Sequence, residues 1–130
     1  MIHWSLCTPA VGRFYGEKVR NSEYAEWIRC HNKVQKADWD KMAKRMPISE
    51  KEIEDWVIAT KEGGFKYLTF VTKHHDGVAF WNSKVSDYTY GNLSGTHFDV
   101  LKCLKEKCEK HGIVCVLLFS MAGLGRYERT

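Results

Sequence analysis

One pattern occurs twice in this chain: an amphipathic helix, a glycine, and then an apolar β-strand. In the first copy, Ser49-Glu50-Lys51-Glu52 forms a capping box, in which the serine and the glutamate satisfy each other's backbone N–H groups. Apolar and partly apolar residues follow at helical spacing, namely Ile53, Trp56, Val57 and Thr60. Gly63-Gly64 is expected to end this helix in the left-handed conformation. The run 65–72 is rich in aromatic and β-branched residues, which predicts a strand.

The second copy begins near residue 100. Its helical stripe consists of Val100, Leu101, Leu104 and Cys108, and Gly112 is expected to end the helix. The run 113–119 that follows is continuously apolar. Such a run is typical of a parallel strand buried on both faces.

Two helix–strand units in succession favour an α/β fold built around a parallel sheet. We expect residues 1–5 to be the remainder of a preceding strand and residues 37–46 to contain a helix closed by Pro47. Three parallel strands are too few to close a barrel, so the chain is expected to be the front portion of a larger unit. We find no linker and no second domain, and treat residues 1–130 as one segment.

Composition excludes several classes of protein. The formal net charge is +4, and basic and acidic residues are interspersed, so no nucleic-acid-binding stripe is expected. No apolar run approaches the roughly 18 residues that cross a bilayer, and the N-terminus lacks the pattern of a signal peptide, so neither membrane contact nor a compartment is predicted. The five cysteines include no Cys-x-x-Cys pair, which favours buried free thiols.

Polar side chains follow each expected strand. The run Thr72-Lys73-His74-His75-Asp76-Gly77 lies where the second strand ends and its loop begins, His3 lies at the equivalent point of the first strand, and Ser120 lies at the end of the third. Because the carboxyl ends of parallel strands meet at one edge, where β/α barrels hold their active sites, these residues form the candidate site.

Three interpretations of the histidines are open. His3, one residue of the His74-His75 pair and Asp76 could supply three metal ligands, although adjacent histidines on an extended chain point to opposite faces. The histidines could also merely bond backbone carbonyls at a strand end. Alternatively, neutral imidazoles, which offer one donor and one acceptor each, could bind a polyhydroxylated ligand.

The chain closely resembles the retaining alpha-L-fucosidase family, through motifs that occur in order along most of its length. The most specific of them is Lys73-His74-His75-Asp76-Gly77. The supporting matches are Ile2-His3-Trp4, Glu26-Trp27, Ala43-Lys44, Trp56, Gly64-Phe65-Lys66-Tyr67, Ser83-Lys84-Val85-Ser86-Asp87-Tyr88 and Lys110-His111-Gly112-Ile113.

The resemblance implies roughly the first three βα units of a partial (β/α)8 TIM barrel that hydrolyses terminal α-linked L-fucose from glycans, without a cofactor or metal. It places sugar contacts at His3, Glu26, Trp27, His74 and His75. The family's nucleophile and acid/base residue are expected beyond Thr130, so the catalytic pair lies outside this chain, which alone would be inactive. Trp39 and Trp56 are expected to be packing residues, and Trp81 could be either.

The chain departs from the family pattern at Ser5, where the family prefers Gly, at Val78, where it prefers Phe, and at Phe119, where a Tyr is expected. A non-catalytic fucose-binding remnant therefore stays open as an alternative, as does a metal-assisted hydrolase. Open barrel edges would also leave strands unpaired, which predicts self-association.

Overall fold

The structure is a computed structural model that describes residues 1–10, 13–14, 17–18, 27–45 and 47–121. Its elements in chain order are η1 (Thr8–Ala10), β1 (Arg13–Phe14), β2 (Glu17–Lys18), α1 (Ile28–His31), α2 (Lys36–Asp40), η3 (Lys41–Lys44), α3 (Glu50–Glu62), β3 (Tyr67–Lys73), α4 (Tyr90–Ser94), α5 (Val100–His111) and β4 (Val114–Phe119). The repeated sequence pattern thus becomes α3–β3 and α5–β4, as predicted.

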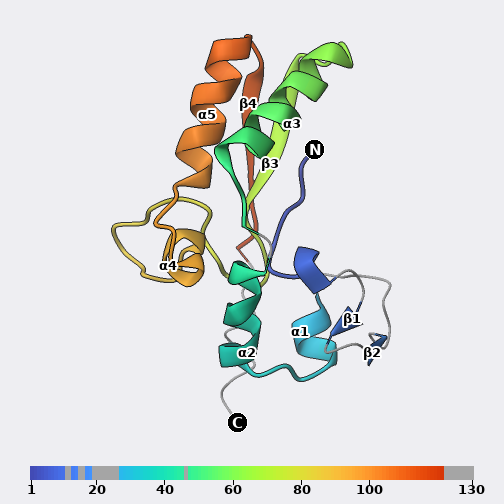
Figure 1. Ribbon diagram of the computed structural model, residues 1–130, viewed down its shortest axis with the longest axis vertical. Coiled ribbons are helices and arrows are strands. Elements are labelled where there is room, and N and C mark those ends of the chain that lie inside the picture. Colours follow the sequence, from blue (N-terminus) through green and yellow to red (C-terminus); the bar gives the residue numbers. More distant parts are fainter. Residues whose placement is uncertain (11–12, 15–16, 19–26, 46, 122–130) are drawn as a thin grey trace.

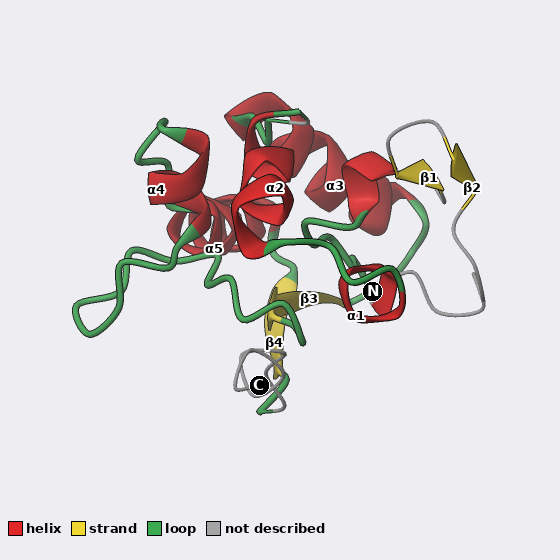
Figure 2. Ribbon diagram, turned by 90° about the horizontal axis from the view of Figure 1, so that it is seen from below, coloured by secondary structure: helices red, strands yellow, loops and turns green. Residues whose placement is uncertain are grey.

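The two long strands form a parallel sheet. The register runs from Tyr67 opposite Val114 to Val71 opposite Leu118, with an irregularity between Val71 and Lys73. Helices α3 and α5 lie side by side along this sheet (Figure 1) and cover one side of it (Figure 2). The expectation of an α/β chain with parallel strands is therefore confirmed for these two units. The short strands β1 and β2 form a separate antiparallel pair.

The strand expected at residues 1–5 is present only as a single parallel bridge between Ile2 and Phe70. The Ile2 N–H donates to the carbonyl of Thr69 (2.7 Å), and the Val71 N–H donates to the carbonyl of Ile2 (3.1 Å). The chain then leaves the sheet, because the Thr8 N–H donates to the carbonyl of Ser5 in a tight turn. The N-terminal segment therefore lies beside β3 without forming a ladder.

Helix α3 begins as the sequence predicts. The Glu52 N–H donates to Ser49 Oγ (3.2 Å), and the Ser49 N–H donates to Glu52 Oε2 (2.8 Å), which completes the capping box. The end of the helix differs in detail: Gly63 has φ −71°, and Gly64 takes the left-handed conformation, with φ +78°. The prediction for Gly112 is correct, since its φ is +71°.

The helix expected over residues 37–46 is divided into two short pieces. Helix α2 ends at Asp40, and the tighter turn η3 continues to Lys44, while Met46 lies outside the described residues. Trp39, Met42 and Ala43 are all buried, so both short pieces pack against the core. No helix in the described ranges has the length and apolar content needed to cross a membrane.

Aromatic side chains make up the centre of the core. The edge of Trp4 meets Phe80 and Tyr90, with ring centroids 5.4 and 5.5 Å away, and Phe80 stacks on Tyr90 at 5.5 Å. Phe70 of β3 packs edge-on against Phe80 (5.8 Å). Such pairs stabilise a core beyond the area they bury. The core therefore joins the N-terminal segment, β3 and the loop that precedes α4.

The free thiols are packed inside as expected. Cys7, Cys103 and Cys108 are buried and Cys115 is half-buried, whereas the side chain of Cys30 lies outside the described part. Burial raises the pKa of Cys108 to about 12, with the neighbouring Cys115 adding to the rise. Such a thiol stays protonated at neutral pH.

The expectation that strand β4 is buried on both faces is wrong for this chain. Val114, Leu117 and Phe119 are between 51% and 61% exposed, and Val116 and Leu118 are also exposed. Within the described residues, β4 pairs with β3 alone, and α5 covers only part of one face. The composition of β4 is that of a buried strand, but the described residues supply too few packing partners to bury it.

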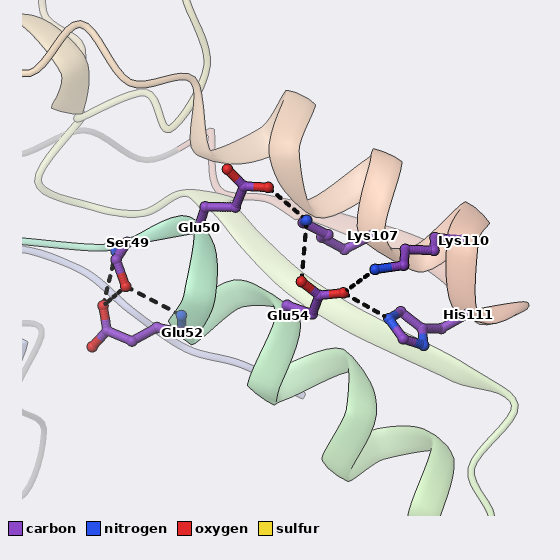
Figure 3. A network of polar contacts seen from close by, with 7 residues as sticks. All are labelled: Ser49, Glu50, Glu52, Glu54, Lys107, Lys110 and His111. Atoms are coloured by element: carbon purple, nitrogen blue, oxygen red, sulfur yellow. Dashed lines mark hydrogen bonds and ion pairs between the residues drawn. The ribbon is translucent and has the colours of Figure 1, made fainter.

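Glu54 of α3 links this helix to α5 (Figure 3). Its carboxylate accepts hydrogen bonds from Lys107 (3.2 Å) and Lys110, and His111 Nε2 lies 3.1 Å from Oε1. Lys107 also pairs with Glu50 (2.6 Å). Hydrogen bonds from Lys110, then His111 and Lys107, lower the pKa of Glu54 from 4.5 to about 2.

Replacing Glu54 with Gln should remove a pH-dependent part of the stability. Because the pKa of Glu54 is lowered by folding, its ionised form stabilises the fold above pH 4.5, and this contribution is lost as the pH falls from 4.5 towards about 2. The Tm of the wild type, followed by circular dichroism, should therefore approach that of Glu54→Gln over this range. Glu62→Gln, at the exposed end of the same helix, is the control. A Tm difference that stays constant with pH would contradict the assignment.

Candidate functional site

Four rings from three separate segments meet just beyond the end of β3, and we call His3, Trp27, His74 and His75 the ring cluster. The centroids of His3 and His74 are 4.6 Å apart, and those of His74 and His75 are 4.3 Å apart. Trp27 lies 4.7 Å from His75, with the two planes inclined by 37°. The structure thus brings together every described residue among the predicted sugar contacts.

The sheet explains why these rings meet. His3 comes directly after the bridging residue Ile2, and His74 and His75 come directly after β3. The loop after β3 turns sharply, because the Gly77 N–H donates to the carbonyl of His74 (3.0 Å). Trp27 is the residue before α1, which lies near the lower end of the N-terminal segment (Figure 1).

The end of β4 reaches the same place. The Ser120 N–H donates to the carbonyl of Lys73 (2.9 Å), which extends the pairing of the two strands by one step. Ser120 Oγ and His75 Nδ1 lie 3.1 Å apart, within hydrogen-bond distance. The expectation that polar residues after the strands gather at one edge is therefore confirmed for His3, His74, His75 and Ser120.

The cluster combines polar ring atoms with aromatic faces. His3 is exposed, and the other three rings are half-buried, so the group can be reached from solvent. Neutral imidazole offers one donor and one acceptor, and the indole of Trp27 offers an apolar face. This combination suits a ligand that carries several hydroxyl groups beside an apolar surface.

Asp76, the residue after His75, forms hydrogen bonds with backbone N–H groups. It is 6% exposed, and its carboxyl group accepts hydrogen bonds from the N–H groups of Leu6 (3.2 Å) and Val78 (3.1 Å). Burial raises the pKa of Asp76, against the effect of these two hydrogen bonds and of the charge on Arg29. Among the described residues, no group of three His, Cys, Asp or Glu side chains is arranged to hold a metal ion, so the structure gives no support to the alternative metal site of His3, Asp76 and either His74 or His75.

The remaining candidates have varied outcomes. Glu26 lies outside the described residues. Trp39 is fully buried, and Trp56 stacks on Phe70 at 6.4 Å, so both are packing residues as expected. The ring centroids of Trp81 and Phe119, the last residue of β4, are 6.3 Å apart. Trp81 lines a hollow of about 900 Å³ between α5 and β4, which none of the four rings of the cluster lines.

Sequence reasoning did not assign a role to Tyr88. Its hydroxyl donates to Asp40 Oδ1 (2.7 Å), and Lys36 Nζ lies 3.9 Å from the ring centroid. Burial, followed by the hydrogen bond to Asp40, raises the pKa of Tyr88. Tyr88 belongs to the run 83–88 that carries the family resemblance, but only the fold shows that it anchors the loop after β3 to α2.

The chain is similar to known proteins in both sequence and fold. The family model for alpha-L-fucosidase matches residues 1–128. Alpha-L-fucosidase AlfC from Lactobacillus casei, solved with alpha-L-fucose product, is 31% identical with a TM-score of 0.78, over 91% of this chain and 36% of that one. An alpha-L-fucosidase from Bacteroides thetaiotaomicron, solved as a trapped covalent intermediate, is 30% identical with a TM-score of 0.78, over 90% of this chain and 26% of that one. No functionally curated protein matches the chain.

Proposed function

The chain belongs to the alpha-L-fucosidase family, and we propose that it forms the first part of a (β/α)8 domain that hydrolyses terminal α-linked L-fucose with retention. The ring cluster is the observation that carries this proposal. The similar Lactobacillus casei structure holds the alpha-L-fucose product, and that from Bacteroides thetaiotaomicron is a covalent intermediate, which supports a retaining route. Residues 1–130 would be the N-terminal segment of that domain.

In this proposal, the ring cluster binds the fucose ring. His3, His74 and His75 exchange hydrogen bonds with its hydroxyl groups, because each neutral imidazole has one donor and one acceptor. The face of Trp27 packs against the apolar methyl group of the deoxy sugar. Glu26, beside Trp27 in the sequence, adds charge-assisted hydrogen bonds to adjacent hydroxyl groups.

The proposal assigns binding, but not bond cleavage, to these residues. A retaining glycosidase needs two carboxyl groups about 5–5.5 Å apart, one to attack the sugar and one to protonate the leaving oxygen. Asp76 is buried, and both its oxygens accept backbone N–H groups, which leaves it unsuited to attack. The chain spans 36% and 26% of the two relatives above, so the nucleophile and the acid/base residue are assigned to sequence that this chain lacks.

L-Fucose should change the tryptophan fluorescence of the chain, because Trp27 is the indole of the ring cluster. His74→Ala and Trp27→Phe should each abolish this response. His97→Asn, on the loop between α4 and α5, is the matched control and should keep it. L-Galactose, in which a hydroxymethyl group replaces the methyl group, should bind more weakly. Equal responses from the wild type and His74→Ala would contradict the assignment.

The chain alone should release no fucose from an aryl fucoside, because it lacks the proposed carboxyl pair. The assay follows the aryl alcohol by absorbance, with a full-length family member as the positive control. Release that survives repeated purification would contradict this prediction. A non-catalytic, fucose-binding remnant is the second candidate function. It is favoured by a chain that has the ring cluster but lacks the catalytic carboxyl pair. Restoring the remaining length of the domain should give activity if the first candidate holds and none if the second does.

We also propose that the chain self-associates through β4. This strand has one neighbour in the described structure and exposes Leu117, Phe119 and other apolar side chains. An exposed apolar edge strand is a template for pairing with another chain.

Leu117→Lys should therefore shift the chain towards monomer in size-exclusion chromatography with light scattering, because a charge on β4 opposes edge pairing. Val85→Lys is the matched control, since Val85 is 95% exposed in a loop away from the sheet. A wild type that elutes only as a monomer at all concentrations would contradict this prediction.

A further inference from the structure

Asp76 is a buried acidic residue that is not one of the proposed sugar contacts. Its Oδ2 accepts a hydrogen bond from the Leu6 N–H, on a segment 70 residues earlier in the chain, and its Oδ1 accepts one from the Val78 N–H. Both hydrogen bonds are buried. A buried donor left without its acceptor costs more than the hydrogen bond itself stabilises, so these contacts strongly favour one loop arrangement.

Each segment that carries the ring cluster has a group that acts on this carboxyl. Leu6 follows His3 by three residues, and Asp76 itself follows His75. Arg29 follows Trp27 by two residues and is buried, and its positive charge opposes the rise in the pKa of Asp76 that burial causes. Asp76 therefore lies where the N-terminal segment, α1 and the loop after β3 converge.

The segment after His3 forms a turn that two hydrogen bonds close. Its turn is closed by the Thr8 N–H donating to the carbonyl of Ser5 (3.0 Å) and by the Ser5 N–H donating to Thr8 Oγ1 (3.1 Å). Leu6 is fully buried within that turn. The hydrogen bond from the Leu6 N–H to Asp76 therefore fixes the position of this turn, and with it the course of the chain after His3.

We propose that Asp76 is the positioning residue of the ring cluster, fixing His3 against His74 by tying the turn after His3 to the loop after β3. This inference rests on the proposed function, in which these rings bind fucose. Small displacements of binding groups weaken a site sharply, so loss of the tie should reduce fucose binding although Asp76 touches no sugar.

Asp76→Asn tests this proposal. Asparagine keeps the shape of the side chain but offers one acceptor oxygen and one donating amide, so it cannot accept both N–H groups. Val78→Ala is the matched control: it shortens a fully buried side chain in the same loop and leaves the two hydrogen bonds to Asp76 in place. Asp87→Asn changes an exposed aspartate and should have no effect.

Two measurements on the full chain separate the possible results. The first, without sugar, is the NMR cross-peak between the rings of His3 and His74. The second is the fucose titration. We expect Asp76→Asn to lose the cross-peak and to bind fucose about tenfold more weakly, and Val78→Ala to lower the Tm while keeping both.

The proposal is overturned if Asp76→Asn keeps the cross-peak and the wild-type affinity, or if Val78→Ala weakens binding equally, since the effect would then be one of general stability. A wild type that does not bind fucose would contradict the proposed function alone. In that case the cross-peak would still decide whether Asp76 positions the rings.

Discussion

Parallel pairing at β3 is the constraint on which the rest of this structure depends. Ile2 pairs on one side of the strand and β4 on the other, so three segments distant in sequence point the same way. Parallel strands end at a common edge, and the first residues after them are therefore neighbours. His3, His74, His75 and Ser120 all come within one or two residues of such an end, and they lie together for that reason.

The aromatic core and the ring cluster are joined through the N-terminal segment. Trp4, which packs on Phe80 and Tyr90, follows His3 directly, so the N-terminal segment is held between an aromatic core and the ring cluster. The hydroxyl of Tyr90 also accepts a hydrogen bond from the Ile48 N–H (2.7 Å), at the entry to α3. Glu54 then joins α3 to α5 at the far end of the helix layer. The N-terminal segment that carries His3 is thus part of the same packed unit as the aromatic core.

Strand β4 leaves an apolar surface exposed. Strand β4 has the composition of a buried strand but is exposed, and the hollow between α5 and β4 is lined by apolar residues such as Leu101, Leu117 and Phe119. Relatives with longer chains share this part of the fold, since the alignment covers 90% or more of this chain but a minority of theirs. An apolar surface of this kind needs a covering partner.

The sequence by itself determined the local structure and the family. Capping residues, helical stripes and glycines predicted α3, α5 and the strands after them, because these signals act within a few residues. The Lys-His-His-Asp-Gly run and the motifs that accompany it predicted which rings would lie together. Only the tertiary structure decided that the N-terminal strand shrinks to one bridge, that β4 is exposed and that Asp76 binds the Leu6 N–H. Each of these depends on contacts between segments far apart in the chain, and local sequence patterns carry no information about such contacts.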